Sequence, residues 1–378
     1  MYLILKFILL YLNSYANTSN DNSMFLDFSC KAIDCYNSPS CLYIEGSFNE
    51  SIDFSKIDVK KISHIFSHYH NISEIPDEIM IFKNLTNLSI ISKEFCKLSN
   101  QVNKLHKLEQ LHIDSFTIDK INGSIKNLVN LQKLTIRNDN QKFFYHKELP
   151  YGDYIPNMKY NVYEFDFKKG NFVNLKELFI CIRYQTIKSI FCEKTNTFKR
   201  TAHFHTIKRL PDEICFLHNL KELNITSQEI KNLPENIGNL QNLKILNLNH
   251  NCISNLPESF SKLLNLEILS ISNNYFSKID DKISNLINLV DLDFSFNFNN
   301  KSEYFFEDNL CFNFSKLKKL KYLNLSGLKI SRIHKSIVFI NQNIKFIDLN
   351  LTALSDNDEG DFIGRDTLFY VFENRLLL

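Results

Sequence analysis

A period of 23 residues constrains the fold more than any other feature of this sequence. Between residues 210 and 299, copies begin with an apolar residue, a proline and an acid, as in Leu210-Pro211-Asp212 and Leu256-Pro257-Glu258. Apolar residues then recur at fixed offsets, which in one copy are Leu240, Leu243, Leu246 and Leu248. A fixed period of this length is typical of a solenoid, in which each copy is one structural unit stacked on the next.

Weaker copies extend the pattern in both directions. Their first apolar residues are Ile52, Ile75, Leu98, Ile121, Phe165, Leu310 and Ile333. The sequence therefore predicts about eleven repeats between residues 52 and 354, well above the three or so that a stable stack needs.

The spacing inside each copy predicts its secondary structure. Two apolar residues one apart, such as Leu246 and Leu248, indicate the inward side of a short strand, because side chains alternate faces along a strand. Stacked copies would pair these strands into one parallel sheet. The Leu-Pro-acid start predicts a short helical turn with proline at its first position. Asn251, Asn274 and Asn297 follow the strands, where a buried amide can satisfy unpaired backbone groups. Copies with another residue there (His70, Lys93, Phe116, Arg183 or Gln228) are expected to be looser.

The pattern L-x-x-L-x-L-x-x-N-x-I resembles the leucine-rich repeat of the 23-residue Leu-Pro-x-x-Ile type. That type is similar to the intracellular Ras-group proteins and to leucine-rich-repeat proteins of AT-rich eukaryotic parasites. The resemblance implies an α/β fold, a right-handed horseshoe with a parallel concave sheet and short helical turns on the convex side. It also implies a non-catalytic recognition scaffold.

The two ends of the chain differ from the repeats. Residues 1–12 are apolar apart from Lys6, and Ser14-x-Ala16 fits a cleavage site, so residues 1–16 have the proportions of a signal peptide. The alternative is an apolar segment that covers the first repeat. Residues 17–51 are expected to form an N-terminal cap. Residues 355–378 are expected to form a C-terminal cap with a short helix from Asp366 to Phe372 and a closing strand.

Composition limits the partners. The net charge of +2 gives no reason to expect nucleic acid or an anionic membrane. No segment after the leader is long and apolar enough to span a bilayer. Nine cysteines leave at least one unpaired. A disulfide among Cys30, Cys35 and Cys41 stays open as an alternative to free thiols.

The sequence shows no arrangement typical of an enzyme. It lacks a G-x-S-x-G motif, a phosphate-binding glycine loop and paired zinc-finger cysteines. His64, His68 and His70 lie too far apart on one strand to hold a metal together. We therefore expect no catalytic activity, no cofactor and no metal. The sequons at Asn49, Asn71, Asn84, Asn122 and Asn300 arise easily by chance in an asparagine-rich chain.

Three segments interrupt the period, at about residues 144–164, 188–209 and 302–309. The first is rich in tyrosine, and Tyr151 and Tyr154 are candidate binding residues because aromatic side chains dominate interface energetics. Insertions in repeat proteins often lie on the binding face. The alternative is that the first two segments are diverged repeats.

The outward residues of the predicted strands form three columns across the concave sheet, and the middle column is predicted to be Phe66, Ser89, His112, Thr135, Phe179, Asn224, Asn247, Ser270, Asp293, Asn324 and Asp348. The candidate partner-binding residues of the sheet are Phe179, Asn224, Asn247, Asp291, Asp293 and Asp348. About eleven strands at roughly 4.8 Å spacing give a surface on the order of 50 Å long, enough for a protein or an extended peptide. The sequence predicts a secreted, monomeric scaffold that binds a partner protein through this sheet and the inserted loops. The alternative is a cytoplasmic adaptor or regulatory subunit for a signalling enzyme such as a small GTPase or phosphatase.

Overall fold

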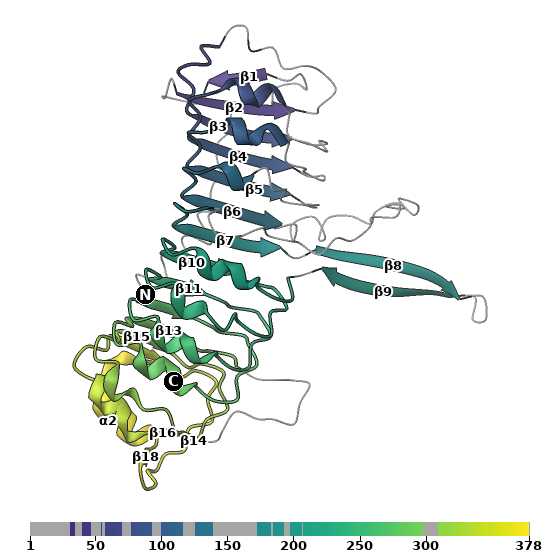
Figure 1. Cartoon of the computed structure of the whole chain (residues 1–378). Coiled ribbons are helices and arrows are strands. Elements are labelled where there is room, and N and C mark those ends of the chain that lie inside the picture. The colour runs from purple at the N-terminus through teal and green to yellow at the C-terminus, as the bar shows by residue number, and fades with distance from the viewer. Residues whose placement is uncertain are drawn as a thin grey trace.

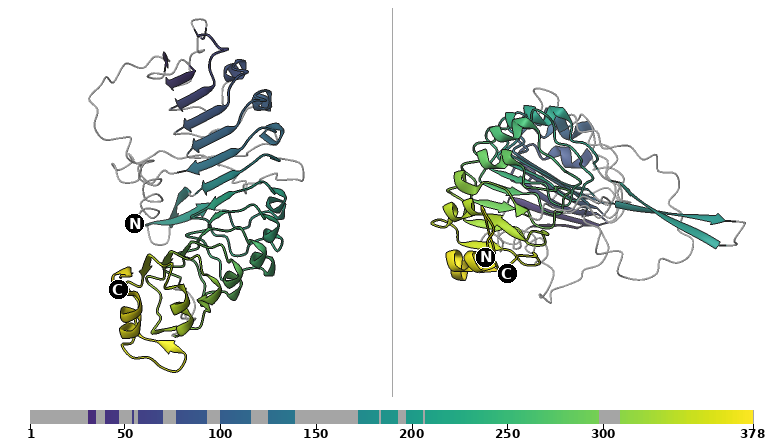
Figure 2. Two further views of the ribbon diagram at one scale, coloured as in Figure 1. Left: turned by 90° about the vertical axis from the view of Figure 1, so that its left-hand side faces the viewer. Right: turned by 90° about the horizontal axis from the view of Figure 1, so that it is seen from below.

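The structure is a computed structural model, and the chain forms a curved stack of similar turns (Figure 1). The structure describes residues 31–34, 40–46, 54, 57–69, 77–92, 100–115, 125–138, 172–182, 184–192, 197–205, 207–297 and 309–377. Strands line one side of the stack and short helical turns line the other (Figure 2). The predicted α/β solenoid is confirmed.

One sheet of 14 strands forms the inner side of the stack. β1 (Lys31–Asp34) is antiparallel to β2 (Cys41–Gly46), and every later pair in the sheet is parallel. The sheet continues through β3 (His64–Tyr69), β4 (Asn87–Ser92), β5 (Gln110–Ser115), β6 (Lys133–Asn138), β7 (Glu177–Ile182), β10 (Glu222–Ile225), β11 (Ile245–Asn247), β12 (Ile268–Ser270), β13 (Asp291–Asp293), β15 (Tyr322–Asn324), β17 (Phe346–Asp348) and β19 (Leu376–Leu377).

The outer wall consists of 3₁₀ turns. They are η2 (Asp77–Ile81), η3 (Asn100–Lys104), η4 (Ile125–Asn127), η6 (Asp212–Phe216), η7 (Ile237–Asn239), η8 (Glu258–Lys262), η9 (Asp281–Asn285), η10 (Phe314–Lys316) and η11 (Lys335–Ile340). The prolines stand one position earlier than the sequence predicts. Pro211 and Pro257 precede η6 and η8 with extended backbone, and their carbonyls accept the first hydrogen bonds of the turns, from Ile214 and Phe260.

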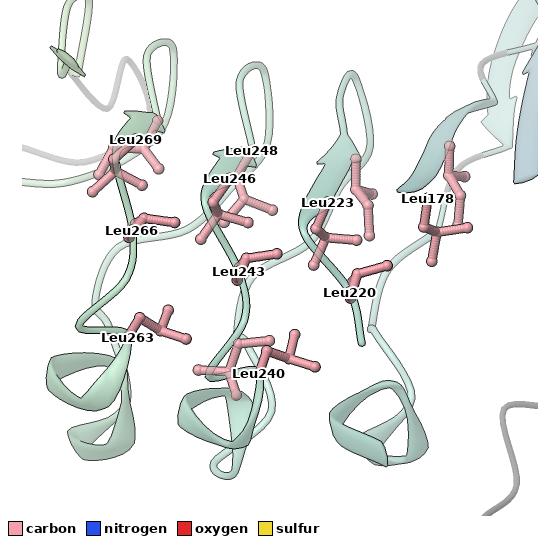
Figure 3. Packing of buried hydrophobic residues seen from close by; sticks show 14 of the residues in the cluster. Leu178, Leu220, Leu223, Leu240, Leu243, Leu246, Leu248, Leu263, Leu266 and Leu269 are labelled. Atoms are coloured by element: carbon pink, nitrogen blue, oxygen red, sulfur yellow. The ribbon is translucent and has the colours of Figure 1, made fainter. Parts of the chain in front are cut away.

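The repeated leucines form one continuous core. Leu220, Leu243 and Leu266 occupy equivalent places in consecutive turns and are fully buried (Figure 3). Each turn alone would leave this apolar face in water, so neighbouring turns stabilise one another.

Buried amides hold the inner edge of each turn. Asn274 Nδ2 donates to the carbonyls of Leu248, Ile271 and Ser272, and its Oδ1 accepts from the amide of Ile253 at 3.0 Å. Asn251 repeats the pattern one turn earlier. The expectation that Gln228 loosens its copy is wrong. Its Oε1 accepts from the amide of Ile207 at 2.8 Å, so the longer amide fills the same place. His70, Lys93, Phe116 and Arg183 lie outside the described residues.

The residue before each buried amide turns the chain out of the sheet. Ser227, His250, Asn273 and Phe296 all have φ between 51° and 59°, in the left-handed region. Such residues end a strand. The copies with a buried asparagine accordingly have three-residue strands, β11 to β13, whereas β3 to β6 run for six residues.

The second interrupting segment is a hairpin rather than a diverged repeat. β8 (Tyr184–Cys192) and β9 (Thr197–His205) pair antiparallel in a separate two-stranded sheet that extends away from the stack (Figure 1). Tyr151 and Tyr154, with the rest of the first segment, lie outside the described residues. The third segment is described only at Asn309, which begins the short strand β14 (Asn309–Leu310).

Additional elements lie at both ends of the stack. The pair β1–β2 precedes the first repeat that the sequence predicts. At the other end, α2 (Arg365–Phe372), η12 (Glu373–Arg375) and β19 follow the last repeat, and β16 (Arg332–His334) joins β14 and β18 (Phe362–Ile363). Leu368 and Phe372 of α2 are fully buried against the last turn. In the part of the chain that is described, no helix has both the length and the apolar character to cross a membrane.

Candidate binding surface

The concave face of the sheet carries three columns of outward side chains, and the strand register fixes their members. The middle column is Phe66, Ser89, His112, Thr135, Phe179, Asn224, Asn247, Ser270, Asp293, Asn324 and Asp348. This register agrees with the sequence-based alignment at all of these strands. The sheet itself begins before the first predicted repeat, since the backbone of Tyr43 on β2 is the register partner of Phe66.

The N-terminal half of this face, on strands β3 to β7, combines apolar and basic side chains. Phe66 is 41% exposed and Ile91 42% exposed, on neighbouring strands. Lys133 Nζ lies 5.1 Å from the ring centroid of Phe179 and 2.7 Å from Glu177 Oε2. The half-buried ring of Phe179 therefore lies beside a cation, an attractive arrangement that is also found in protein interfaces.

The C-terminal half is polar because the side chains of its middle column also form the hydrogen bonds that close the turn at the end of each strand. The Oδ1 atoms of Asn247, Asp293 and Asp348 accept from the backbone amides two residues later, those of Asn249, Ser295 and Asn350, at 3.0–3.1 Å. Short polar side chains commonly close turns in this way. These candidate residues therefore stabilise the turns at the strand ends, and Asn247 is only 7% exposed. The signal in the sequence is an Asn or Asp at the middle outward position of the strand, two residues before the amide that its side chain binds.

Carboxylates gather on β13 in a network of short polar side chains. Burial, and then the neighbouring Asp293, raise the pKa of Asp291 to about 7. Burial also raises the pKa of Asp293, although Ser295 and Ser270 oppose this by donating hydrogen bonds to its carboxylate. Asp291 forms no ion pair among the described residues.

Two glutamates lie side by side where the two halves meet. Glu177 and Glu222 are register partners on β7 and β10, and Lys133 pairs with Glu177. Burial and then Glu177 raise the pKa of Glu222, while Lys133 lowers it.

We expect Glu222→Gln to raise the free energy of unfolding at pH 8 by about 0.5 kcal/mol, the scale of a partly exposed charge interaction. A carboxyl whose pKa is raised by folding favours its protonated form in the folded state. Its charge therefore destabilises the fold as the pH rises through the titration, and the gain should vanish near pH 4. Urea unfolding at the two pH values measures this. Glu177→Gln, which removes the charge paired with Lys133, is the control and should give no gain at pH 8.

The six candidate residues in the described part of the chain all lie on the concave sheet. Phe179 is on β7, Asn224 on β10 and Asn247 on β11, and the three aspartates are on β13 and β17. Asp291 belongs to the first column and the other five to the middle column. The surface brings them into one line rather than into a compact pocket.

A second row of asparagines on the opposite edge was not identified from the sequence. Side-chain amides donate to the backbone of the preceding turn, from Asn84 to Lys60, Asn130 to His106, Asn174 to Val129, Asn219 to Val173, Asn242 to His218, Asn265 to Gln241, Asn288 to Leu264 and Asn343 to Lys318, at 2.7–2.8 Å. These residues are exposed or half-buried, and the period alone places them, each directly before the apolar residue (Leu, or Ile344 after Asn343) that precedes the strand. They join turns and leave the concave face free.

Neither metal nor thiol chemistry is evident in the described residues. No three His, Cys, Asp or Glu side chains gather in a way that could hold a metal ion. Cys41, Cys215 and Cys252 are free thiols, whereas Cys30 and Cys35 are not described. Burial raises the pKa of Cys215 to about 12, so this thiol is an apolar filler.

Comparison with known proteins supports the same fold. Residues 206–335 match the family model described as a leucine-rich repeat region. No curated protein sequence matches the chain. Among solved structures, a leucine-rich-repeat protein of Leptospira interrogans is 16% identical, with a TM-score of 0.52 and 90% of each chain covered.

Two further solved structures have a similar fold. An internalin of Listeria monocytogenes is 14% identical, with a TM-score of 0.51, 84% of this chain and 82% of that chain covered. A chain of the octameric complex of Latrophilin 3, Unc5D and FLRT2 is 16% identical, with a TM-score of 0.50, 81% of this chain and 78% of that chain covered. The identities are low, so these likenesses concern the fold. The repeat period, the stacked parallel sheet and the matched region together show that the chain folds as a leucine-rich-repeat solenoid, with residues 206–335 as its matched leucine-rich repeat region.

Proposed function

We propose that the chain is a non-catalytic scaffold that binds a partner protein on its concave sheet. The observation that carries this proposal is the sheet face itself, where outward side chains from β3 to β17 form aligned columns that no other described element covers. The structurally similar complex of Latrophilin 3, Unc5D and FLRT2 supports a recognition role.

The main contact region of this scaffold is the N-terminal half of the face. Phe66, Ile91 and Phe179 offer apolar surface there, whereas Asn247, Asp293 and Asp348 already hold their own turns. Burying exposed apolar area stabilises a complex at roughly 25 cal/mol per Å² before the costs of association. The polar C-terminal half then extends the contact and adds specificity.

Alanine variants that remove exposed apolar side chains from the concave face or from the outer wall test where the partner binds. The double variant Phe66→Ala/Ile91→Ala should abolish quantitative capture of a partner first identified by cross-linking to the wild-type protein. The matched control, Phe216→Ala/Leu264→Ala, removes two similarly exposed side chains from the outer wall and should leave capture unchanged. Equal capture by all three proteins, with unchanged circular dichroism, would contradict a concave binding site.

We place the scaffold outside the cell as a secreted monomer, because its first 16 residues have the proportions of a signal peptide. Mass spectrometry of the mature N-terminus tests this: a chain that keeps residues 1–16 would rule out secretion and leave the alternative, a cytoplasmic adaptor or regulatory subunit. The free thiols of Cys41, Cys215 and Cys252 favour that alternative, since a reducing compartment keeps cysteines unpaired.

A further inference from the structure

The structure separates the sequons of this chain by what their asparagines do. Six Asn-x-Ser/Thr sequons lie among the described residues, at Asn84, Asn87, Asn224, Asn313, Asn324 and Asn350. The sequence pattern makes each a possible acceptor for an N-linked glycan, which must remain in solvent after folding. The side chains differ in whether they can meet that requirement.

Four of the six lie on the concave side of the stack. Asn87, Asn224 and Asn324 stand on strands, Asn350 follows β17, and all four are half-buried. Asn324 Oδ1 accepts from both the backbone amide and the hydroxyl of Ser326, which is 5% exposed. A sugar here would lie between outward side chains of adjacent strands, which are roughly 4.8 Å apart.

Asn84 is committed to the exposed asparagine row. Its Nδ2 donates to the carbonyl of Lys60 at 2.8 Å, and its Oδ1 accepts from Lys107 Nζ at 2.7 Å. A glycan on this nitrogen would have to leave between two stacked turns.

Asn313 differs from the other five. Its side chain is exposed on the outer wall, directly before η10. Its Oδ1 accepts from the backbone amide of Ser315 at 3.0 Å, which caps the turn, and no described residue accepts a hydrogen bond from its Nδ2. The capping atom and the atom that would carry a sugar are therefore different, so a glycan leaves the cap intact.

We propose that Asn313 carries an N-linked glycan. The donor is a lipid-diphosphate-linked oligosaccharide: one Nδ2–H bond is replaced by a bond from Nδ2 to C1 of the first sugar, the lipid diphosphate leaves, and the proton passes to solvent. This modification rests on the secreted form under "Proposed function", since only that route meets the donor. A glycan on the outer wall keeps the concave face free for a partner.

The full chain is expressed in insect cells in two forms, with its own leader and with a heterologous signal peptide added. A peptide N-glycanase hydrolyses the side-chain amide of each glycosylated asparagine and leaves aspartate, so peptide mass spectrometry of the secreted monomer gives the occupancy of each site. We expect Asn313 to be occupied in most chains, and the four concave sequons in almost none.

Two variants distinguish the loss of the acceptor from misfolding. Asn313→Asp keeps a capping oxygen and should abolish the modification with unchanged thermal unfolding, since Asn and Asp cap equally well. Ser315→Thr keeps the sequon and should keep the glycan. Secreted, folded chains with Asn313 unmodified, or with Asn224 or Asn324 modified instead, would overturn the proposal. Glycan on Asn313 only with the heterologous signal peptide would establish the acceptor and refute secretion by the chain's own leader.

Discussion

Replacing Asn274 by alanine is expected to lower the free energy of unfolding by about 3–5 kcal/mol. The side chain is 1% exposed and forms hydrogen bonds with four backbone groups of two adjacent turns. Alanine would leave the amide of Ile253 buried without a partner, which costs roughly 1–3 kcal/mol. It would also remove one hydrogen bond from each of the three carbonyls, which keep Asn251, Asn297 and the amide of His250 as donors, at roughly 0.5–1.5 kcal/mol each. The loss is shared by neighbouring turns, because each turn is stable only through its contacts with the next.

Asn265→Ala is the matched control. This asparagine lies in the same repeat, but its side chain is exposed and makes one hydrogen bond to the carbonyl of Gln241 at 2.8 Å. Water replaces that bond, so the expected loss is about 1 kcal/mol. Urea unfolding followed by circular dichroism measures both. Equal losses would mean that the buried amide contributes no more than a surface bond and would refute the role assigned to it.

The repeat period predicted most of the scaffold because each leucine offset has one physical cause. Leu246 and Leu248 must face a common core, so the residue between them, Asn247, had to point outward. Applying that reasoning to each copy gave the middle column from Phe66 to Asp348. It also gave the place of the buried amides, although it underestimated Gln228, whose longer side chain reaches the same backbone amide.

What the period could not predict lies where local chemistry replaces repetition. No leucine precedes β2 at the offsets of the repeat, although β2 pairs with β3. The hairpin of β8 and β9 has no equivalent segment 23 residues away in the sequence. The turn-closing role of Asp293 depends on a backbone amide two residues away, a contact that the leucine pattern does not encode. From the sequence, Asp293 and Asn247 are predicted only as binding residues. In the structure, the side chain of each also accepts a hydrogen bond from the backbone amide two residues later, where the strand ends.

The outer wall is packed as tightly as the inner edge. We therefore expect Gly238→Ala to lower the free energy of unfolding by about 3 kcal/mol. A β-carbon at Gly238 would lie 2.1 Å from the carbonyl oxygen of Ser259, which belongs to the backbone of the next turn. A side chain could rotate away, but a backbone carbonyl moves only if the stacked turns separate, and overpacking of this kind typically costs 1–3 kcal/mol or more. The amide of Gly238 also donates to Ser259 Oγ at 3.1 Å, so separation loses that bond as well.

Gly360→Ala separates close approach from backbone conformation. Gly360 has a φ of 60°, yet nothing lies within 4 Å of an added β-carbon. Alanine there suffers only the strain of the left-handed conformation, about 1 kcal/mol. Thermal unfolding of the two variants should therefore show the larger fall in melting temperature for Gly238→Ala, although its backbone is the less unusual. If Gly360→Ala were the more damaging change, conformational strain would outweigh contact between turns, and the outer wall could not be what sets the spacing of the stack.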